Sequence, residues 1–583
     1  MTRNILKQRQ RLSTLLALAL VFLCVNFVLG AKPKPFRPPK AKPDTTDEIF
    51  TNGIISTIYV EISSNNMAAL RQSSHKYVRA VVKEGGRTWE DVGVHLKGSA
   101  GSVRSVDENP ALTLNFDKYV DRQKFHGLDK VHLNNSVQDA SMLTELLCGE
   151  MFRASGVPAA RTTHARVFLN GKDLKLYVVK EGFDKTFLRR YFNNPKGNLY
   201  DGGFLRDITE PLEKLTGNEP DDRHELKALA AAALEPDPME RVAKLDKLLD
   251  MDRFISLMVM EIMTFHWDGY VLKKNNYKLY HDPETDKITF FPHGMDQMFW
   301  DPNFTIYPRN VEGMVARGIL ESSEGKKRYR ERVGVLFTNV FNLEALTNRV
   351  LEIQARIRPV LASISADEAK NHDGQVKRII DLLKARAVNL QAQINLPEPK
   401  PLQFDSTGVA TLKVWEAQNI NSNAQLDKGN ENGKALLHIR AGADQKCIAS
   451  WRTRVLLEAG EYRFDGMVKT AGVLPLPPPK QVQGQPEAKE KKGLGAGIRI
   501  HNSTIPRDNQ ALGDTSWQKV SYEFSVKPGE DEKTLVCELR AAKGDAWFEI
   551  DSLKIYKLPP KAPAPEPAKQ PAAAVVKDAL KLQ

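Results

Sequence analysis

The stretch 265–299, FHWDGYVLKKNNYKLYHDPETDKITFFPHGMDQMF, contains the polar residues on which the interpretation of this chain depends. Two polar clusters flank one predicted hairpin: Asp268 and Asn276 precede it, and Asp296 follows it. Phosphoryl transfer needs a carboxylate near the attacking hydroxyl and oxygen ligands that hold a divalent metal on the phosphates. This spacing therefore supplies one candidate base and two candidate metal ligands within a short length of chain.

A structural interpretation of the same residues is also open. Asp268 can belong to a turn, Asn276 can mark the entry to a strand, and Asp296 can cap the next segment. Short motifs of this kind arise often by chance. The neighbouring His266 and His293 are expected to pack against the site or support it rather than to bind a metal.

Upstream of this stretch the chain is rich in strands up to about residue 215. One helix is predicted at 141–155, capped by Asp139, and Asn170-Gly171 predicts a type I′ turn between two strands. After residue 215 the apolar spacing becomes helical, with long helices over 343–394. A strand-rich part, one embedded helix and a helical part together form the outline of a bilobal kinase, although other α+β proteins share that outline.

The segment 403–556 has a different, all-β pattern. Alternating apolar positions recur in short runs such as Trp517-Gln-Lys-Val-Ser-Tyr-Glu-Phe-Ser-Val526. Strands at this spacing predict a jelly-roll sandwich. A proline-rich interruption begins near Leu474 and reads as a surface insertion.

The two ends of the chain indicate export. Residues 1–30 combine basic residues, the apolar run 12–29 and small residues, which is typical of a secretory signal peptide. A Pro/Lys-rich linker follows at 31–48, and a Pro/Ala/Lys-rich tail covers 558–583. We expect a secreted, periplasmic or envelope protein, and a membrane association only if the signal sequence stays uncleaved as an anchor.

Composition limits the function classes. A chain of 583 residues is too long to fold around a single hydrophobic core, so two or three folded units are expected. The net charge of +12 would attract polyanions, but we see no nucleic-acid-binding motif and expect no nucleic acid partner. Cys148 is expected to be buried, whereas Cys447 and Cys537 could form a disulfide in an oxidising compartment.

Several short motifs follow one another along the chain. They are Val94-His-Leu-Lys-Gly-Ser99, Leu133-Asn-Asn135, Leu176-Tyr-Val-Val-Lys-Glu181, Gly197-Asn-Leu-Tyr200, Met251-Asp-Arg-Phe254, HWDGY, NNYKLY and FPHGMDQ. In this order they resemble the core of the CotH kinases, relatives of spore coat protein H. The resemblance covers roughly residues 55–395 and implies an α+β fold, with an atypical bilobal protein-kinase-like domain at 49–400 followed by a sandwich at 401–557.

The resemblance also implies a chemistry: ATP with Mg²⁺ or Mn²⁺, and transfer to Ser or Thr of a protein substrate. Asp268 would be the catalytic acid/base, with Asn276 and Asp296 as metal ligands. On the nucleotide side the matching residues are Lys97, Lys180 and Glu181. The two lysines can equally be solvated strand residues.

One departure from the family pattern concerns a lysine. Many members carry lysines just before and within the strand that here reads Asn109–Phe116, and this stretch has none. Another lysine must substitute, or ATP binds poorly. Glu145 and Glu150 on the predicted helix could partner a lysine, but surface solvation is the interpretation we favour for both.

The sandwich resembles galactose-binding and carbohydrate-binding modules in the strands that carry Trp517 and Trp547. Such modules bind polysaccharide by stacking aromatic rings on sugars, but we expect both tryptophans in the sandwich core. Two functions remain. The first is an exported atypical protein kinase, and the alternative is a non-catalytic pseudokinase scaffold or adhesion protein that binds cell-surface glycan through its sandwich.

Overall fold

A computed structural model of the chain divides into two compact units. The first runs to Leu396 and the second begins at Pro397, except that 236–240 and 321–324 cluster with the second. The expected signal peptide, and most of the linker, insertion and tail, lie outside the described residues. The structure describes residues 44–98, 101–218, 222–420, 422–444, 446–476, 493–503 and 507–560.

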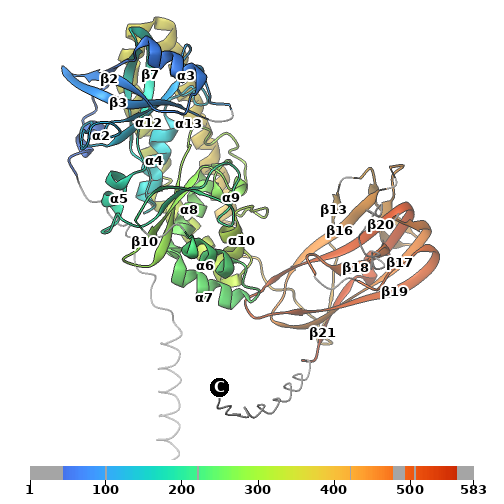
Figure 1. Cartoon of the computed structure of the whole chain (residues 1–583). Helices are drawn as coiled ribbons and strands as arrows, with labels where there is room; N and C mark the ends of the chain where they lie inside the picture. The colour runs from blue at the N-terminus through green and yellow to red at the C-terminus, as the bar shows by residue number, and fades with distance from the viewer. Residues whose placement is uncertain are drawn as a thin grey trace, which may run out of the picture. The chain divides into compact units, whose positions relative to one another are not determined.

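The N-terminal half of the first unit is a closed seven-stranded barrel, drawn in blue to cyan in Figure 1. Inward-facing residues such as Val60, Leu114 and Val131 are buried and form its core. Their outward neighbours alternate with them, as the two-residue period of a strand requires. In barrel order the strands are β1 (Ser56–Glu61), β2 (Val78–Glu84), β3 (Arg87–Lys97), β4 (Ala111–Asn115), β5 (Lys130–Asn134), β7 (Lys172–Glu181) and β6 (Thr162–Leu169).

The hairpin between β6 and β7 has the predicted turn. Asn170 and Gly171 both have positive φ, at 49° and 82°, which a type I′ turn requires. The C-terminal residues of β7 pair with β5 on one side and with β6 on the other. Lys180 lies in this part of the strand, which is fixed by hydrogen bonds on both sides.

Helix α4 (Thr144–Ala154) is the predicted embedded helix, but it begins three residues later than expected. Met142 has a φ of 57°, so the chain is not helical there. The N-cap residue is Leu143 and not the predicted Asp139, although the Asp139 carboxylate accepts hydrogen bonds from the backbone N–H groups of Ser141 and of Thr144, the first helical residue, both at 3.0 Å. Most of the helix is buried.

The rest of the first unit combines helices with a four-stranded sheet of order β11-β10-β8-β9. Helix α8 is apolar on almost every side, which explains why nearly all of it is buried. The hairpin β10–β11 turns at 283–286, as the sequence predicted. The strands are β8 (Leu199–Asp201), β9 (Glu213–Thr216), β10 (Tyr277–Asp282) and β11 (Lys287–Pro292); the helices are α5 (Lys185–Tyr191), α6 (His224–Ala233), α7 (Pro238–Leu248), α8 (Met251–Met263) and α9 (Tyr270–Lys273).

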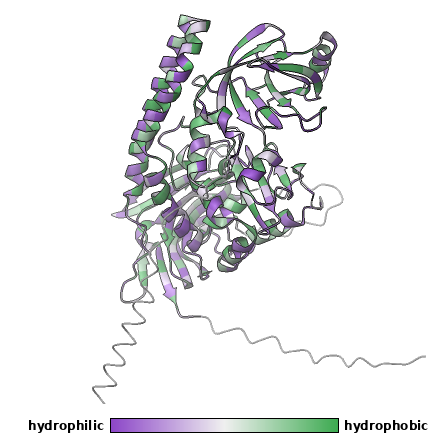
Figure 2. Cartoon of the chain, turned by 90° about the vertical axis from the view of Figure 1, so that its left-hand side faces the viewer, coloured by the Kyte–Doolittle hydropathy of each residue, from purple (hydrophilic) through white to green (hydrophobic). Residues whose placement is uncertain are grey.

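Six further helices belong to the described part of the unit: α2 (Asp47–Thr51), α3 (Ser64–Gln72), α10 (Met314–Leu320), α11 (Ser323–Asn339), α12 (Leu343–Ile364) and α13 (Ala366–Ile394). The long helices show alternating polar and apolar colouring along their length in Figure 2. On α12 the buried residues recur every three or four positions, so one stripe faces the core. No helix in the described part of the chain is long and apolar enough to cross a membrane.

The second unit is an all-β sandwich. Its long strands are β16 (Cys447–Leu456), β17 (Gly460–Pro475), β19 (Gly513–Val526) and β20 (Glu532–Glu549). Cys447 and Cys537 are buried free thiols, so the considered disulfide is not formed. The remaining elements are β12 (Val409–Thr411), β13 (Glu416–Asn419), β14 (Gln425–Glu431), β15 (Lys434–Arg440), β18 (Gly495–Ile500), a 3₁₀ turn (Ile550–Ser552) and β21 (Lys554–Leu558).

The sandwich core corrects the expectation for the two tryptophans. Trp451 is a core residue, whereas Trp517 and Trp547 are half-buried and lie outside the core. The Nζ atom of Lys469 lies 5.3 Å and 5.0 Å from the ring centroids of Trp517 and Trp547. Trp547 also stacks on His438 at 4.9 Å. Trp517 lies at an odd position of β19, whose core residues from Val520 onward are at even positions, and Trp547 lies between the buried Ala546 and Phe548 of β20, so the pleat places both outside.

Candidate active site

A buried ion pair joins the barrel to helix α4. The Nζ atom of Lys180 on β7 contacts the Oε1 atom of Glu145, and both side chains are almost fully buried. Burial of a lone charge is costly, so each residue stabilises the ionised form of the other. The favoured expectation of surface solvation is therefore wrong for Glu145. Glu150 instead pairs with Arg349 on α12, at 2.7 Å.

Lys97 lies close to this pair. Its Nζ donates to Oδ1 of Asn134 at 2.5 Å, and the amide of Asn134 donates to Glu145 at 2.7 Å. Burial, with the nearby charge of Lys180, lowers the pKa of Lys97 to about 8. The following Gly98 has a φ of 118°, and Ser99 of the predicted phosphate loop lies outside the described residues.

A third lysine, which the sequence analysis did not select, faces the same region. Lys278 on β10 is buried and pairs with Asp201 at 2.6 Å. The ring of Phe183 lies beneath Lys180 and Lys278, with Nζ-to-centroid distances of 5.8 Å and 5.2 Å. Burial and the charge of Lys180 lower the pKa of Lys97 and of Lys278, and the three neighbouring lysines make the region electropositive and suited to phosphate.

Asp268, Asn275 and Asn276 come together in the loop after α8. The Oδ2 atom of Asp268 accepts hydrogen bonds from the side-chain amides of Asn275 and Asn276, at 3.0 Å and 2.8 Å. Asn276 has a φ of 47°, which asparagine tolerates better than most residues. Partial burial raises the pKa of Asp268 above its usual value. A raised pKa makes a carboxylate a better proton acceptor.

The hairpin returns Asp296 to the same place. The backbone N–H of His293 donates to the Asn276 carbonyl at 2.8 Å, and a Cβ at Gly294 would come within 2.7 Å of Asn276 Oδ1. The Asp296 carbonyl accepts a hydrogen bond from Thr144 at the start of α4, at 3.1 Å. Burial, with the charge of Glu145, raises the pKa of Asp296 to about 6.

The two histidines support these segments, as expected. His266 is buried, and its Nε2 lies 3.2 Å from the Gly294 carbonyl. The Nδ1 of His293 lies 3.3 Å from the Lys180 Nζ. Burial and the neighbouring lysines lower the pKa of His293 well below its usual range, so it is a neutral acceptor.

Glu181 does not face the lysine cluster. It follows Lys180 directly in β7 and so points to the other side of the strand. There its carboxylate accepts from the Arg161 Nε at 3.0 Å and from the Arg161 backbone N–H at 3.2 Å. The carboxylate of Glu181 is thus used by a buried ion pair and is not available to a nucleotide.

Two buried charged residues hold the loop of Asp268, and both were missed in the sequence. Glu261 on α8 accepts hydrogen bonds from the backbone N–H groups of Tyr270 and Val271, at 3.2 Å and 2.8 Å. Arg386 on α13 donates to the Met263 carbonyl at 3.0 Å, at the end of α8. The only sequence signal was a charge within an otherwise apolar helical stripe.

A cavity of about 410 Å³ opens beside Asp296. Its walls include Trp267, which precedes Asp268, and Trp300, which is 54% exposed. The remaining lining combines the start of α4 with α13. It therefore offers apolar surface next to both candidate catalytic segments.

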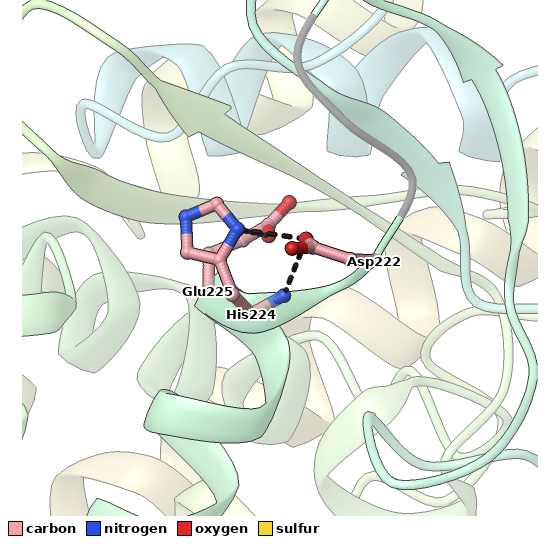
Figure 3. A group of neighbouring side chains, drawn as sticks. All are labelled: Asp222, His224 and Glu225. Atoms are coloured by element: carbon pink, nitrogen blue, oxygen red, sulfur yellow. Dashed lines mark hydrogen bonds and ion pairs between the residues drawn. The ribbon is translucent and has the colours of Figure 1, made fainter. Parts of the chain in front are cut away.

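Another carboxylate and imidazole group lies at the start of α6 (Figure 3). His224 Nδ1 is 2.8 Å from an Asp222 oxygen and 3.4 Å from Glu225. The His224 backbone N–H also donates to Asp222 at 3.1 Å, and Glu225 accepts from Tyr200 at 2.8 Å. The Asp222 bond satisfies the first N–H group of α6, and the Glu225 bond attaches the helix to β8, so these contacts account for the group without a metal.

The fold and the site define a class. A buried lysine on a strand of the N-terminal half pairs with a glutamate on the adjacent helix, and an Asp–Asn loop faces an aspartate that follows a hairpin. Protein kinases place their phosphate lysine, helix glutamate, catalytic Asp and metal ligands in this way. The first unit is an atypical bilobal protein-kinase-like domain.

Comparison with known proteins gives the family. The CotH kinase protein family model matches residues 94–390, just over half of the chain. The chain belongs to the CotH kinase family. It is 28% identical to Invasin CotH2 of Rhizopus delemar over 39% of this chain and 44% of that protein. It is 22% identical to the inner spore coat protein H of Bacillus subtilis over 47% of this chain and 80% of that protein.

Solved structures show weaker likenesses. The Helicobacter pylori proinflammatory kinase CtkA matches 51% of this chain and 97% of its own, at 9% identity and a TM-score of 0.24. A CBM4 structure matches 27% of this chain and 95% of its own, at 14% identity and a TM-score of 0.18. These scores are too low for a residue-level comparison.

Proposed function

We propose that the protein is an exported kinase that transfers the γ-phosphate of ATP to Ser or Thr hydroxyls of surface or extracellular proteins. The observation that carries the proposal is the buried Lys180–Glu145 pair beside the Asp268–Asn276 loop. Lys180 supplies the lysine that the 109–116 strand lacks, because it reaches the same helix from a neighbouring part of the barrel. The departure from the family pattern is therefore compensated.

The residues fit a divalent metal. Within the described residues the carboxylate of Asp296 has no ion-pair partner. The amide nitrogen of Asn276 donates to Asp268, which leaves the Oδ1 atom of Asn276 as a possible metal ligand. Carboxylate and amide oxygens are the ligands that Mg²⁺ and Mn²⁺ prefer. Asp296 and Asn276 would hold the ion. When bound, such an ion neutralises charge on the β- and γ-phosphates.

The chain's own residues would then act as follows. Lys180 and Lys97 neutralise the phosphate oxygens, and the two asparagines fix the orientation of the Asp268 carboxylate. Asp268 accepts the proton of the acceptor hydroxyl as the new O–P bond forms and the bond to the ADP oxygen breaks. We place the polypeptide acceptor in the cavity walled by Trp267 and Trp300.

The test is metal-dependent ATP consumption and autophosphorylation by the wild type, Asp268→Ala and Asp296→Ala. Asp121→Ala is the control, because Asp121 is exposed and remote from the site in sequence. We expect labelling with Mg²⁺ or Mn²⁺ in the wild type and control, and none in the two folded site variants. A folded wild type that neither binds nor turns over ATP would leave the pseudokinase scaffold as the function.

The scaffold alternative has one observation in its favour. The sandwich contains a polar pocket of about 250 Å³ on the face opposite its core. A hydrogen-bonding hollow of this kind suits a polyhydroxylated ligand such as a glycan. Binding there would place the protein at a cell surface with or without kinase activity.

A further inference from the structure

The polar pocket of the sandwich is lined by side chains from three neighbouring strands, β16, β20 and β18, together with Ile420 and residues 501–503, which follow β18. Alternate residues of these strands, including Trp451, Cys537 and Ile498, belong to the core. The residues between them therefore point to the opposite face, where they form the pocket. The polar lining consists of Ser450, Arg452, Arg499, His501, Asn502, Ser503, Glu538 and Arg540.

Positive charge exceeds negative charge in this group. Glu538 is 3% exposed and pairs with three guanidinium groups: Arg499 and Arg507 at 2.9 Å, and Arg540 at 3.2 Å. The arginines hold the pKa of Glu538 at about 2, so the carboxylate stays ionised. One carboxylate cannot neutralise three cations.

Arg452 adds a fourth positive charge without a carboxylate. Within the described part of the sandwich it has no ion pair; its Nε donates to Ser450 at 3.0 Å, and its Nη1 lies 3.4 Å from His501. Burial and the charge of Arg499 lower the pKa of Arg452. Burial and the nearby arginines also lower the pKa of His501, so no histidine charge adds to the excess.

A second observation points to a missing partner. The side chain of Arg499 is only 15% exposed. Its Nε atom is buried and has no hydrogen-bond acceptor. A buried donor without an acceptor costs free energy. An oxyanion in the pocket would supply that acceptor and would offset the repulsion among the arginines.

We propose that this pocket binds an acidic saccharide unit, through a carboxylate or sulfate group held by Arg452, Arg499 and Arg540. A planar guanidinium group can donate two parallel hydrogen bonds to two oxygens of a planar carboxylate or a tetrahedral sulfate. Asn502 is exposed in the lining and contributes the amide group that a sugar body requires. At about 250 Å³ the pocket is smaller than the roughly 300–1,000 Å³ of drug-sized sites, which suits one ring of a longer glycan.

The test is calorimetric titration of the full chain with short oligosaccharides of matched length: one uronic-acid-containing, one sulfated and one neutral. Short ligands avoid the general attraction of a polyanion to a basic protein. We expect an acidic ligand to bind at least tenfold more tightly than the neutral one, and the tighter acidic arm to identify the anionic group. Arg452→Gln and Arg540→Gln should each weaken binding about tenfold or more.

Arg440→Gln is the matched control, because it removes the same charge from an exposed position of the same sandwich, where Arg440 pairs with Asp545 at 2.7 Å. Equal loss in the control would show general charge attraction and overturn the assignment. Equal affinity for the neutral and acidic oligosaccharides would overturn the proposal that the pocket recognises an anionic group. An affinity for inorganic sulfate equal to that for the acidic oligosaccharide would overturn the proposal that it recognises a sugar. Circular dichroism checks that each variant folds. The kinase assay above does not bear on this result.

Discussion

The two units depart from ordinary burial in different ways. The kinase-like unit buries a balanced ion pair, Lys180 and Glu145, which are 1% and 4% exposed. The sandwich buries one carboxylate, Glu538, among three arginines, and leaves Trp517 and Trp547 half-buried outside its core. Buried charge and exposed apolar surface are the informative exceptions in a folded protein. The comparison suggests that each unit retains its exceptions for binding rather than for stability.

The largest expected effect comes from breaking the buried pair. Lys180→Met should lower the free energy of unfolding of the first unit by about 3–5 kcal/mol, because it leaves Glu145 charged and buried. Lys469→Met on the sandwich should change stability by at most about 1 kcal/mol, because the Lys469–Glu431 pair is partly exposed. Urea unfolding measures both.

A double variant tests whether the stability loss comes from the unpaired charge of Glu145. Lys180→Met combined with Glu145→Leu removes both charges and should recover most of the lost stability while nucleotide binding stays absent. A double variant as unstable as Lys180→Met alone would contradict the account of the pair.

The tryptophans of the sandwich provide the next test. Trp451→Ala should lower the free energy of unfolding by about 3–5 kcal/mol, because it empties part of the core. Trp517→Ala and Trp547→Ala should each cost less, about 1 kcal/mol, because both lie outside the core. Thermal unfolding of the three variants measures the difference, and equal losses would show that the outer tryptophans are core residues after all.

A smaller effect is expected from the loop support. Glu261→Ala removes the acceptor for two backbone N–H groups of the loop that follows Asp268. We expect kcat to fall about tenfold while the affinity for ATP is unchanged, since a misplaced base slows only the chemical step. Glu352→Ala, an exposed position on α12, is the control. A matching loss of ATP affinity would assign Glu261 a purely structural role.

The smallest effect concerns pH. Lys97 has a pKa of about 8 in the folded protein, below its ordinary value of 10.5. Between pH 8 and 10.5 Lys97 is protonated in the unfolded chain and deprotonated in the folded protein. The unfolded state therefore binds more protons, and the contribution of Lys97 to the free energy of unfolding rises with pH. Its contribution to nucleotide affinity should fall over the same range by a few fold. Lys97→Gln should remove both trends; persistence of either in the variant would assign it to another group.

The sequence predicted the site only where the contacts are local. Asp268 and Asn276 share one loop, so their spacing was enough to bring them together. The Lys180–Glu145 contact spans 35 residues and depends on how α4 packs against the barrel, which no periodicity specifies. Arg386 acts from a helix 123 residues from the carbonyl it bonds, whereas Glu261 lies only nine and ten residues before the two N–H groups it accepts from. In both cases a lone charge in an apolar stripe does not indicate its partner.

The misplaced tryptophans had a readable signal. In β19 the apolar residues Val520, Tyr522 and Phe524 occupy even positions, so Trp517 at an odd position belongs to the other face. In β20 the core positions change from odd, at Leu535 to Ala541, to even, at Ala546 and Phe548, so only the local alternation places Trp547 on the other face. In these strands the two-residue period therefore indicates burial better than aromatic size does.

The central claim is that the buried cluster of the first unit is a metal–nucleotide site. The most direct measurement is calorimetric titration of the full chain with a non-hydrolysable ATP analogue, with and without Mg²⁺ or Mn²⁺. The account predicts one saturable site that needs the metal and is weakened at least tenfold by Asp296→Ala. Absence of binding by the folded wild type, or binding that neither the metal nor Asp296→Ala affects, would contradict it.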